Sequence, residues 1–364
     1  MRFVLIGRGM RVPDHRRYHA LDAMRGIAAL GVVILHIGDQ LHQRLFPHAY
    51  LAVDFFFMLS GFVLARAYEE RLKTSLSAPR FVEMRLIRLY PLFALGVLLG
   101  TARVVSRVMD AAPHSMTAAG AFMAFFANML MLPAWASPDV LFPFDVPAWS
   151  LFLEILINIA FAVVLYRLAS RFLACFCLAA GALLFWAIFH RGYNDLGALW
   201  STAGFGLLRV GFSFLLGILL ARMRMAAKSN SPMALLPLIA LALLLAAPWP
   251  AGFGAQIDAI AVFVAMPLLL WAGARTELPP SWQPAGAVLG DISYPLYAIH
   301  FPLLQIFFHV FFRTLHLPAV LAGVLFVAGV AWLSWYLAHR FDAPVRRWLS
   351  GRMRLRPAAM PVGP

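Results

Sequence analysis

A succession of eleven apolar runs, most of them long enough to cross a lipid bilayer, constrains the fold of this chain more than any other feature. The runs lie at 21–42, 49–69, 89–107, 118–135, 148–168, 171–189, 203–221, 233–249, 256–273, 290–312 and 318–338. Of all residues, 62% are hydrophobic and only 13% are charged, whereas a soluble domain has about 25% charged residues. A soluble fold could not cover this much apolar surface, so the sequence predicts an all-α integral membrane protein.

The basic residues indicate how the runs are oriented. Lys and Arg number 30 against 16 Asp and Glu, and they gather in short segments between the apolar runs. Cytoplasmic loops of membrane proteins carry an excess of Lys and Arg and face an anionic leaflet. The net charge of +14 is therefore interpreted as a sign of topology, with the lipid bilayer as partner and no nucleic acid.

The run at 118–135 differs from the others. Eleven crossings would place the basic cluster at 222–228 outside, whereas ten crossings place every basic cluster in the cytoplasm. Asn128 and Pro133 interrupt this run. We therefore predict a polytopic bundle of about ten transmembrane helices, plus one re-entrant or interfacial helix at 118–135 on the outer side.

The chain is predicted to form one membrane domain, residues 20–348, between two basic ends that both lie in the cytoplasm. Residues 1–19 contain five arginines and precede a run without a small-residue cleavage site, which is typical of an uncleaved signal anchor. Residues 349–364 form the second basic end. Cys175 and Cys177 share an apolar run, so a disulfide framework is excluded and we expect buried thiols.

Ionisable residues inside apolar runs are candidates for function, because a charge in hydrocarbon costs at least about 2.5–3.5 kcal/mol. Arg25 and His36 lie in the first run, and on a helix their spacing returns to within about 20° of one face, about 16 Å along the axis. A cation near the cytoplasmic surface and a deep imidazole on one stripe suit a long donor with an anionic head, such as acyl-CoA. The alternative is that Arg25 reaches to the interface and His36 bonds a backbone carbonyl.

Further polar residues accompany this pair in neighbouring runs. Arg85 and Arg88 share a helical face and could contact phosphate, or could simply carry cytoplasmic charge. Asp54 needs a polar partner, either substrate or a group on another helix, and Ser60 and Gly61 beside it permit close helix approach.

Two later segments add candidates. Glu154 lies within about two turns of the outer surface in the run at 148–168, where it could orient an imidazole, hold an acceptor hydroxyl or complement the helix dipole. Tyr294, Tyr297 and His300 recur every three residues, so they line one side of a helix and could wall a polar cavity or anchor the interface. We expect no metal site.

Several of these segments, taken in chain order, form a recognisable pattern. The segments are Leu21 to His36, Val53 to Phe62, Arg85 to Pro91, Trp149-Ser150-Leu151 with Glu154, Ile292 to His300, and Phe341 to Pro344. Together they resemble the acyltransferase-3 family of bacterial membrane O-acyltransferases, over about residues 18–348.

The resemblance implies a roughly ten-helix enzyme of the bacterial inner membrane. Such enzymes take an acyl group, usually acetyl, from cytoplasmic acyl-CoA and deliver it to a hydroxyl of an envelope or exported carbohydrate. The chain departs from the family pattern in having only Glu154 where many members have two acidic residues, and Asp342 where Glu is commoner. Many members also carry a fused soluble esterase-like domain, which we expect this chain to lack.

The mechanism that we expect assigns catalysis to His36 and Glu154, with His36 as the general base. A sugar hydroxyl is a poor nucleophile, and a neutral imidazole within about 3 Å can accept its proton during attack on the thioester. An acyl-His36 intermediate is the alternative route. The residues expected to bind substrate are Arg25, Arg85, Arg88, Asp54, Tyr297 and His300.

Two other functions compete with this hypothesis. A transporter or flippase of a glycan or lipid-linked intermediate would also bury charges along a path, but the sequence contains no inverted repeat. A structural membrane protein would scatter its polar residues instead of gathering them in ordered motifs.

Overall fold

A computed structural model describes residues 18–110, 112, 115–223, 229–230, 232–250 and 252–354. Within these residues each of the eleven apolar runs forms a helix, and the strands β1 (Ser229–Asn230) and β2 (Thr276–Glu277) have two residues each. The predicted all-α membrane class is thereby confirmed. The outer parts of the two basic ends, at 1–17 and 355–364, lie outside the described residues.

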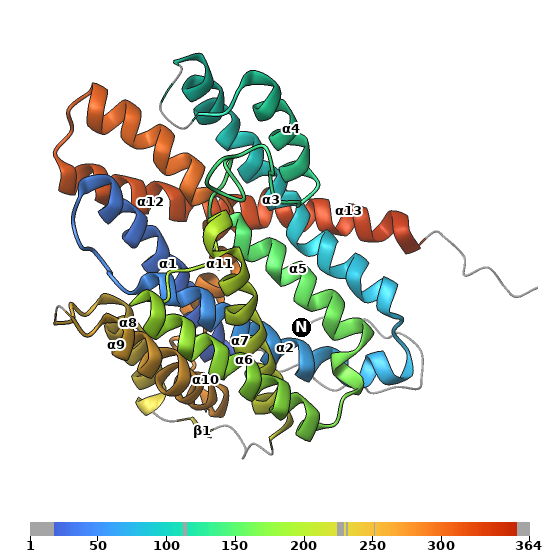
Figure 1. The fold of residues 1–364 in the computed structure, drawn as a ribbon. Coiled ribbons are helices and arrows are strands. Elements are labelled where there is room, and N and C mark those ends of the chain that lie inside the picture. The colour runs from blue at the N-terminus through green and yellow to red at the C-terminus, as the bar shows by residue number, and fades with distance from the viewer. Residues whose placement is uncertain are drawn as a thin grey trace, which may run out of the picture.

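Eight helical segments of the described chain are long and apolar enough to cross a membrane. They comprise α1 (His19–Leu41), α2 (Ala52–Thr74), α3 (Ala78–Met109), α6 (Ser170–Arg191), α7 (Ala203–Arg222), α9 (Gly254–Ile260) with α10 (Met266–Arg275), α11 (Gln283–Phe307), and α12 (Ala319–Leu337) with α13 (Ala343–Arg354). One π-helical turn joins α9 to α10 and another joins α12 to α13, so each pair is a continuous segment. Figure 1 shows these helices as one bundle.

Three apolar helices are shorter, namely α4 (Ala118–Met129), α5 (Ala148–Val163) and α8 (Leu236–Ala246). The 12 residues of α4 extend about 18 Å, too little to cross a hydrocarbon core of about 30 Å. This length agrees with a helix that does not cross, and its side of the membrane stays a prediction. With 16 and 11 residues, α5 and α8 fall below the usual span of about 20 residues, so eight of the ten expected crossings meet that length.

Glycines allow the central helices to pack closely. α1 and α11 lie side by side, and a Cβ atom at Gly26 would overlap the backbone of α11 (Figure 1). α2 and α7 form a second close pair, in which Gly61 faces the backbone of α7 and Gly217 faces that of α2. The sequence prediction that Gly61 permits close helix approach is confirmed. Small residues at such contacts let helices associate where lipid provides no hydrophobic driving force.

The segment between α4 and α5 folds into the bundle. Phe142 and Phe144 are buried in it, and the carbonyl of Phe144 lies so close to α3 that only a glycine, Gly100, fits opposite. Gly96, one turn earlier, likewise faces the carbonyl of Ala298 in α11. These contacts bring the start of α5 beside α11, where the polar residues of both helices meet.

The outer faces of α6 and α12 expose large apolar side chains, such as Leu178 at 72% and Trp332 at 63%. Lipid is the medium that suits such surfaces. Cys177 is buried but Cys175 is exposed, so the expectation of two buried thiols was wrong for Cys175. Because α6 lies at the edge of the bundle, residues two positions apart face opposite environments.

Candidate active site

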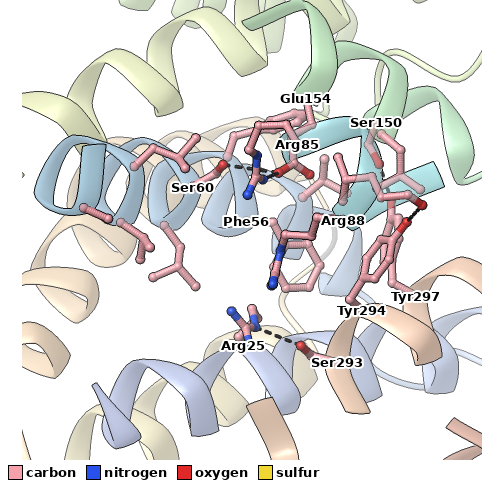
Figure 2. A pocket seen from close by; sticks show the side chains of 18 of the residues that line it. Arg25, Phe56, Ser60, Arg85, Arg88, Ser150, Glu154, Ser293, Tyr294 and Tyr297 are labelled. Carbon is pink, nitrogen blue, oxygen red and sulfur yellow. Dashed lines mark hydrogen bonds and ion pairs between the residues drawn. The ribbon is translucent and has the colours of Figure 1, made fainter. Parts of the chain in front are cut away.

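A cavity of about 310 Å³ lies between α1, α2, α3, α5 and α11. Figure 2 shows the side chains around it. The charged residues that line it are Arg25, Arg85, Arg88 and Glu154. Three guanidinium groups therefore share this cavity with one carboxylate. This excess of positive charge, partly shielded from water, favours an anionic ligand.

Arg25 enters the cavity from α1 and is held by α11. Its Nε donates to Ser293 Oγ at 2.8 Å and one terminal nitrogen donates to the carbonyl of Gly290 at 2.7 Å. The carboxylate of Asp22, one turn back, is 3.2 Å from the same terminal nitrogen. The side chain stays 28% exposed, so the guanidinium is fixed in direction and still open to a ligand.

Arg85 and Arg88 approach from α3. Arg85 pairs with Glu154 of α5 at 2.7 Å, and Ser60 of α2 donates to the same carboxylate oxygen at 3.3 Å. Arg88 forms no hydrogen bond or ion pair with the described part of the chain, and Figure 2 shows it extending toward Arg25. Glu154 thus contacts a guanidinium and a hydroxyl, not the imidazole that the sequence suggested as one partner.

Tyrosines close the other end of the cavity. Tyr297 of α11 lies 2.6 Å from Ser150 Oγ and donates to the carbonyl of Pro147 at 3.1 Å. Phe56 of α2 packs against its ring at 5.7 Å. Tyr294 also lines the cavity and donates its hydroxyl hydrogen to the carbonyl of Leu89. The predicted polar wall on α11 therefore includes both tyrosines.

His36 and His300 meet beyond this wall. His36 Nδ1 is 3.0 Å from His300 Nε2, and the two ring planes lie within 22° of each other with their centroids 5.1 Å apart. Neither residue is among those that line the cavity. Tyr297, which lines the cavity, has its ring 6.0 Å from that of His300, so it connects the cavity wall to the histidine pair. Arg25 and His36 both contact α11, which agrees with their predicted position on one stripe of α1.

Asp54 lies away from the cavity. Its carboxylate binds Arg209 of α7 at 2.7 Å and accepts from the Asn194 side chain at 3.1 Å, and both charged groups are fully buried. Of the two partners that the sequence left open for Asp54, the structure contains the ion pair to another helix. Substrate binding by Asp54 gains no support from this position.

The sequence analysis did not predict two residues that hold the polar side chains described above. Arg209 is fully buried inside an apolar run, and the cost of a charge there was a signal that could have identified it. Ser293 holds Arg25, but a serine in a helix carries no comparable signal, because hydroxyls are common in membrane helices.

Comparison with known proteins identifies the kind of molecule that contains this site. A sequence model described as an acyltransferase domain matches residues 18–339, which is nearly the whole chain and includes every cavity residue. The chain belongs to the acyltransferase-3 family. The resemblance inferred from the motifs is thus confirmed, and the protein is a multi-pass membrane acyltransferase.

Individual relatives match parts of the chain. Protein 2 in the picA locus of Rhizobium radiobacter is 38% identical over 157 residues, which are 40% of this chain and 81% of that protein. Acyltransferase MdmB of Streptomyces mycarofaciens is 29% identical over 168 residues, 43% of this chain and 41% of that protein. The match thus spans less than half the length of MdmB. No solved structure matches this chain.

Proposed function

We propose that this acyltransferase moves an acyl group, acetyl in the first instance, from cytoplasmic acyl-CoA to a hydroxyl of an envelope or exported carbohydrate. Arg25, Arg85 and Arg88 bind the CoA phosphates, and His36 accepts the proton of the hydroxyl. The enzyme works in a bacterial inner membrane, with the arginine side of the cavity toward the cytoplasm.

The observation that carries the proposal is the charge of the cavity. Its three guanidinium groups face one carboxylate, Glu154, which pairs with Arg85. Arg88 forms no ion pair among the described residues, with Asp342 acting on it only at longer range, and Arg25 pairs with Asp22 but keeps part of its surface open. Phosphate groups suit such a site, because guanidinium binds phosphate through paired, charge-assisted hydrogen bonds.

The position of the histidine pair supports the direction of transfer. On α1, His36 lies about 16 Å from Arg25 along the helix axis, and both contact α11. A donor that leaves its phosphates at Arg25 must extend a narrow arm along this stripe to bring its thioester near His36. The pantetheine arm of CoA has that form. Tyr297 lines the cavity and lies beside His300, so the arm must pass this side chain.

The proposed reaction is a direct transfer of the acyl group from the thioester to the acceptor hydroxyl, and it consumes no water. The acceptor oxygen attacks the thioester carbonyl carbon, the carbon–sulfur bond breaks, and the proton of the hydroxyl moves to His36. The same proton then neutralises the CoA thiolate, so His36 returns to its starting state. The proposal predicts that loss of the His36 imidazole abolishes transfer while donor binding survives.

The test measures binding and transfer separately. Binding of acetyl-CoA to purified protein in detergent or nanodiscs is measured by calorimetry for the wild type, Arg25→Gln and Arg88→Gln. The matched control is Lys73→Gln, a cation at the end of α2 that pairs with Glu69 and does not line the cavity. Removing one charge-assisted contact of about 1.5–3 kcal/mol should weaken binding about 10- to 100-fold, and the control should not change it.

Transfer is measured by mass spectrometry of envelope glycans from cells that lack the gene and express the wild type or His36→Ala. We expect acyl groups that depend on the wild type and are absent with His36→Ala at equal protein levels. Unchanged acetyl-CoA binding in both arginine variants would contradict the donor site. Full acylation with His36→Ala would contradict the assignment of the base.

A further inference from the structure

His300 is fully buried, and its surroundings determine which ring nitrogen carries hydrogen. Its Nδ1 lies 3.0 Å from the carbonyl oxygen of Leu296 and 2.9 Å from that of Tyr297. Carbonyl oxygens only accept hydrogen bonds, so Nδ1 of His300 must be a donor. In a neutral imidazole only one nitrogen is protonated, and Nε2 of His300 therefore presents a lone pair.

That lone pair faces His36. The distance from His300 Nε2 to His36 Nδ1 is 3.0 Å, and two lone pairs would repel at this separation. His36 Nδ1 must then carry hydrogen and donate it, which leaves the lone pair of His36 on Nε2. Phe301 packs edge-on against the His36 ring at 5.2 Å and, with the hydrogen bond to His300, fixes the plane of the imidazole.

A charged His300 would be the other way to make this contact. Burying an unpaired imidazolium costs far more than burying a neutral ring. Among the described residues, no carboxylate forms a hydrogen bond or ion pair with either histidine. The neutral pair, with hydrogen on Nδ1 of both rings, is therefore the arrangement that fits.

We propose that His300 is a positioning residue that holds His36 in the tautomer whose Nε2 accepts the proton of the acceptor hydroxyl. The inference rests on the proposed role of His36 as base and extends it. The hydrogen bond on one nitrogen of a histidine sets the protonation of the other. The role also differs from the substrate binding expected of His300, because the residue is buried and does not line the cavity.

The pair also serves the charged stage of the reaction. When His36 Nε2 takes the hydroxyl proton, its ring becomes an imidazolium that still donates from Nδ1 to His300. The His300 ring is polarised in turn by its donation to the carbonyls of Leu296 and Tyr297. The chain of hydrogen bonds spreads the transient positive charge toward two backbone dipoles, and the proton leaves on the CoA sulfur.

The test compares two replacements of His300. His300→Gln places an acceptor oxygen near the position of Nε2, whereas His300→Leu fills the space without an acceptor. His309→Leu is the control, because His309 is exposed on the last turns after α11. For each variant we measure thermal unfolding, acetyl-CoA binding by calorimetry, and acyl content of envelope glycans. The tautomer of His36 is measured by nitrogen NMR on histidine-labelled protein in nanodiscs, with the His36→Ala spectrum identifying the signal.

We expect His36 of the wild type to carry hydrogen on Nδ1. His300→Leu should lower transfer about 100-fold with acetyl-CoA binding unchanged, and should shift the His36 signal toward the Nε2-protonated form. His300→Gln should restore much of the transfer and the wild-type signal. The control should behave as wild type.

The inference is overturned if the wild type shows His36 protonated on Nε2, if His300→Leu transfers at the wild-type rate, or if a folded His300→Gln is no better than His300→Leu. Should His300→Leu not fold, the wild-type spectrum and His300→Gln decide. Failure of the proposed function gives a different result, namely full transfer by His36→Ala.

Discussion

The buried ion pair between Asp54 and Arg209 is the part of the structure whose disruption has the most predictable cost. Arg209 contacts Asp54 through two nitrogens, at 2.7 and 3.2 Å, and both side chains have 0% exposure. Asp54→Asn keeps the shape of the side chain and removes its charge. The guanidinium would remain in the core of the bundle without its ion-pair partner, and only the longer-range attraction of Asp195 and Asp258 would be left.

The expected magnitude follows from what remains around Arg209. Breaking a buried ion pair by removing one partner costs about 3–5 kcal/mol. Arg209 would keep its hydrogen bonds to the carbonyls of Leu196 at 2.8 Å and Tyr50 at 3.0 Å, which hold the guanidinium in part. We therefore expect about 3 kcal/mol of destabilisation for Asp54→Asn, the lower end of that range.

The assay is a double-mutant cycle. Unfolding in detergent is measured for Asp54→Leu, Arg209→Met, the double variant and Asp54→Asn. Each single variant should lose about 3 kcal/mol, whereas the double variant removes both charges of the pair and should lose clearly less than the sum of the two single variants. The control Glu70→Gln changes an exposed carboxylate whose contact with Lys73, at 3.9 Å, is long for an ion pair. This change should shift the free energy of unfolding by less than about 0.5 kcal/mol.

The same variants separate the two roles considered for Asp54. If the carboxylate only holds α2 to α7, folded Asp54→Asn protein should bind acetyl-CoA as the wild type does. Wild-type stability combined with lost acetyl-CoA binding would refute the reasoning from the structure and support a contact between Asp54 and substrate.

Three further predictions concern the cavity, the helix packing and a buried acid. Glu154→Gln should strengthen acetyl-CoA binding about three- to tenfold in calorimetry, because it removes the carboxylate that lines the cavity; weaker binding would mean that the carboxylate is needed to orient the arginine it pairs with. Gly61→Ala should lower the free energy of unfolding by about 1–3 kcal/mol, because the added methyl group pushes α2 away from α7. The control Gly329→Ala, with open space around it, should leave the stability unchanged. Equal effects of the two substitutions would contradict the close approach of α2 and α7. Burial raises the pKa of Asp145 well above its usual range, and neither carboxylate oxygen has a hydrogen-bond partner among the described residues. The folded state therefore retains a proton that the unfolded state loses, and the wild type loses stability as pH rises. The stability gained by Asp145→Asn should then grow as pH rises above the ordinary range of a carboxyl pKa, and a gain independent of pH would contradict a buried neutral acid.

Much of the architecture could be predicted from the sequence because its causes are local. A run of apolar residues forms a helix in lipid whatever lies beside it, since each helix satisfies its own backbone, and all eleven runs are helical. The shared stripe of Arg25 and His36 was also predictable, because it depends only on the helical repeat. The number of membrane crossings depends on more than local sequence, because the ends of a helix are set by neighbouring segments. α5 and α8 are accordingly shorter than the apolar runs that predicted them.

The partners of the polar residues were decided by tertiary structure alone. His36 meets His300 and Asp54 meets Arg209 across 264 and 155 residues of sequence, and periodicity within one helix says nothing about which helix packs against it. The glycines that bring α1 to α11 and α2 to α7 set those pairings through the shape of whole helix surfaces. The sequence by itself determined that charges would be buried in the membrane, and the packing of the helices determined which charges became an ion pair and which were left to line a cavity.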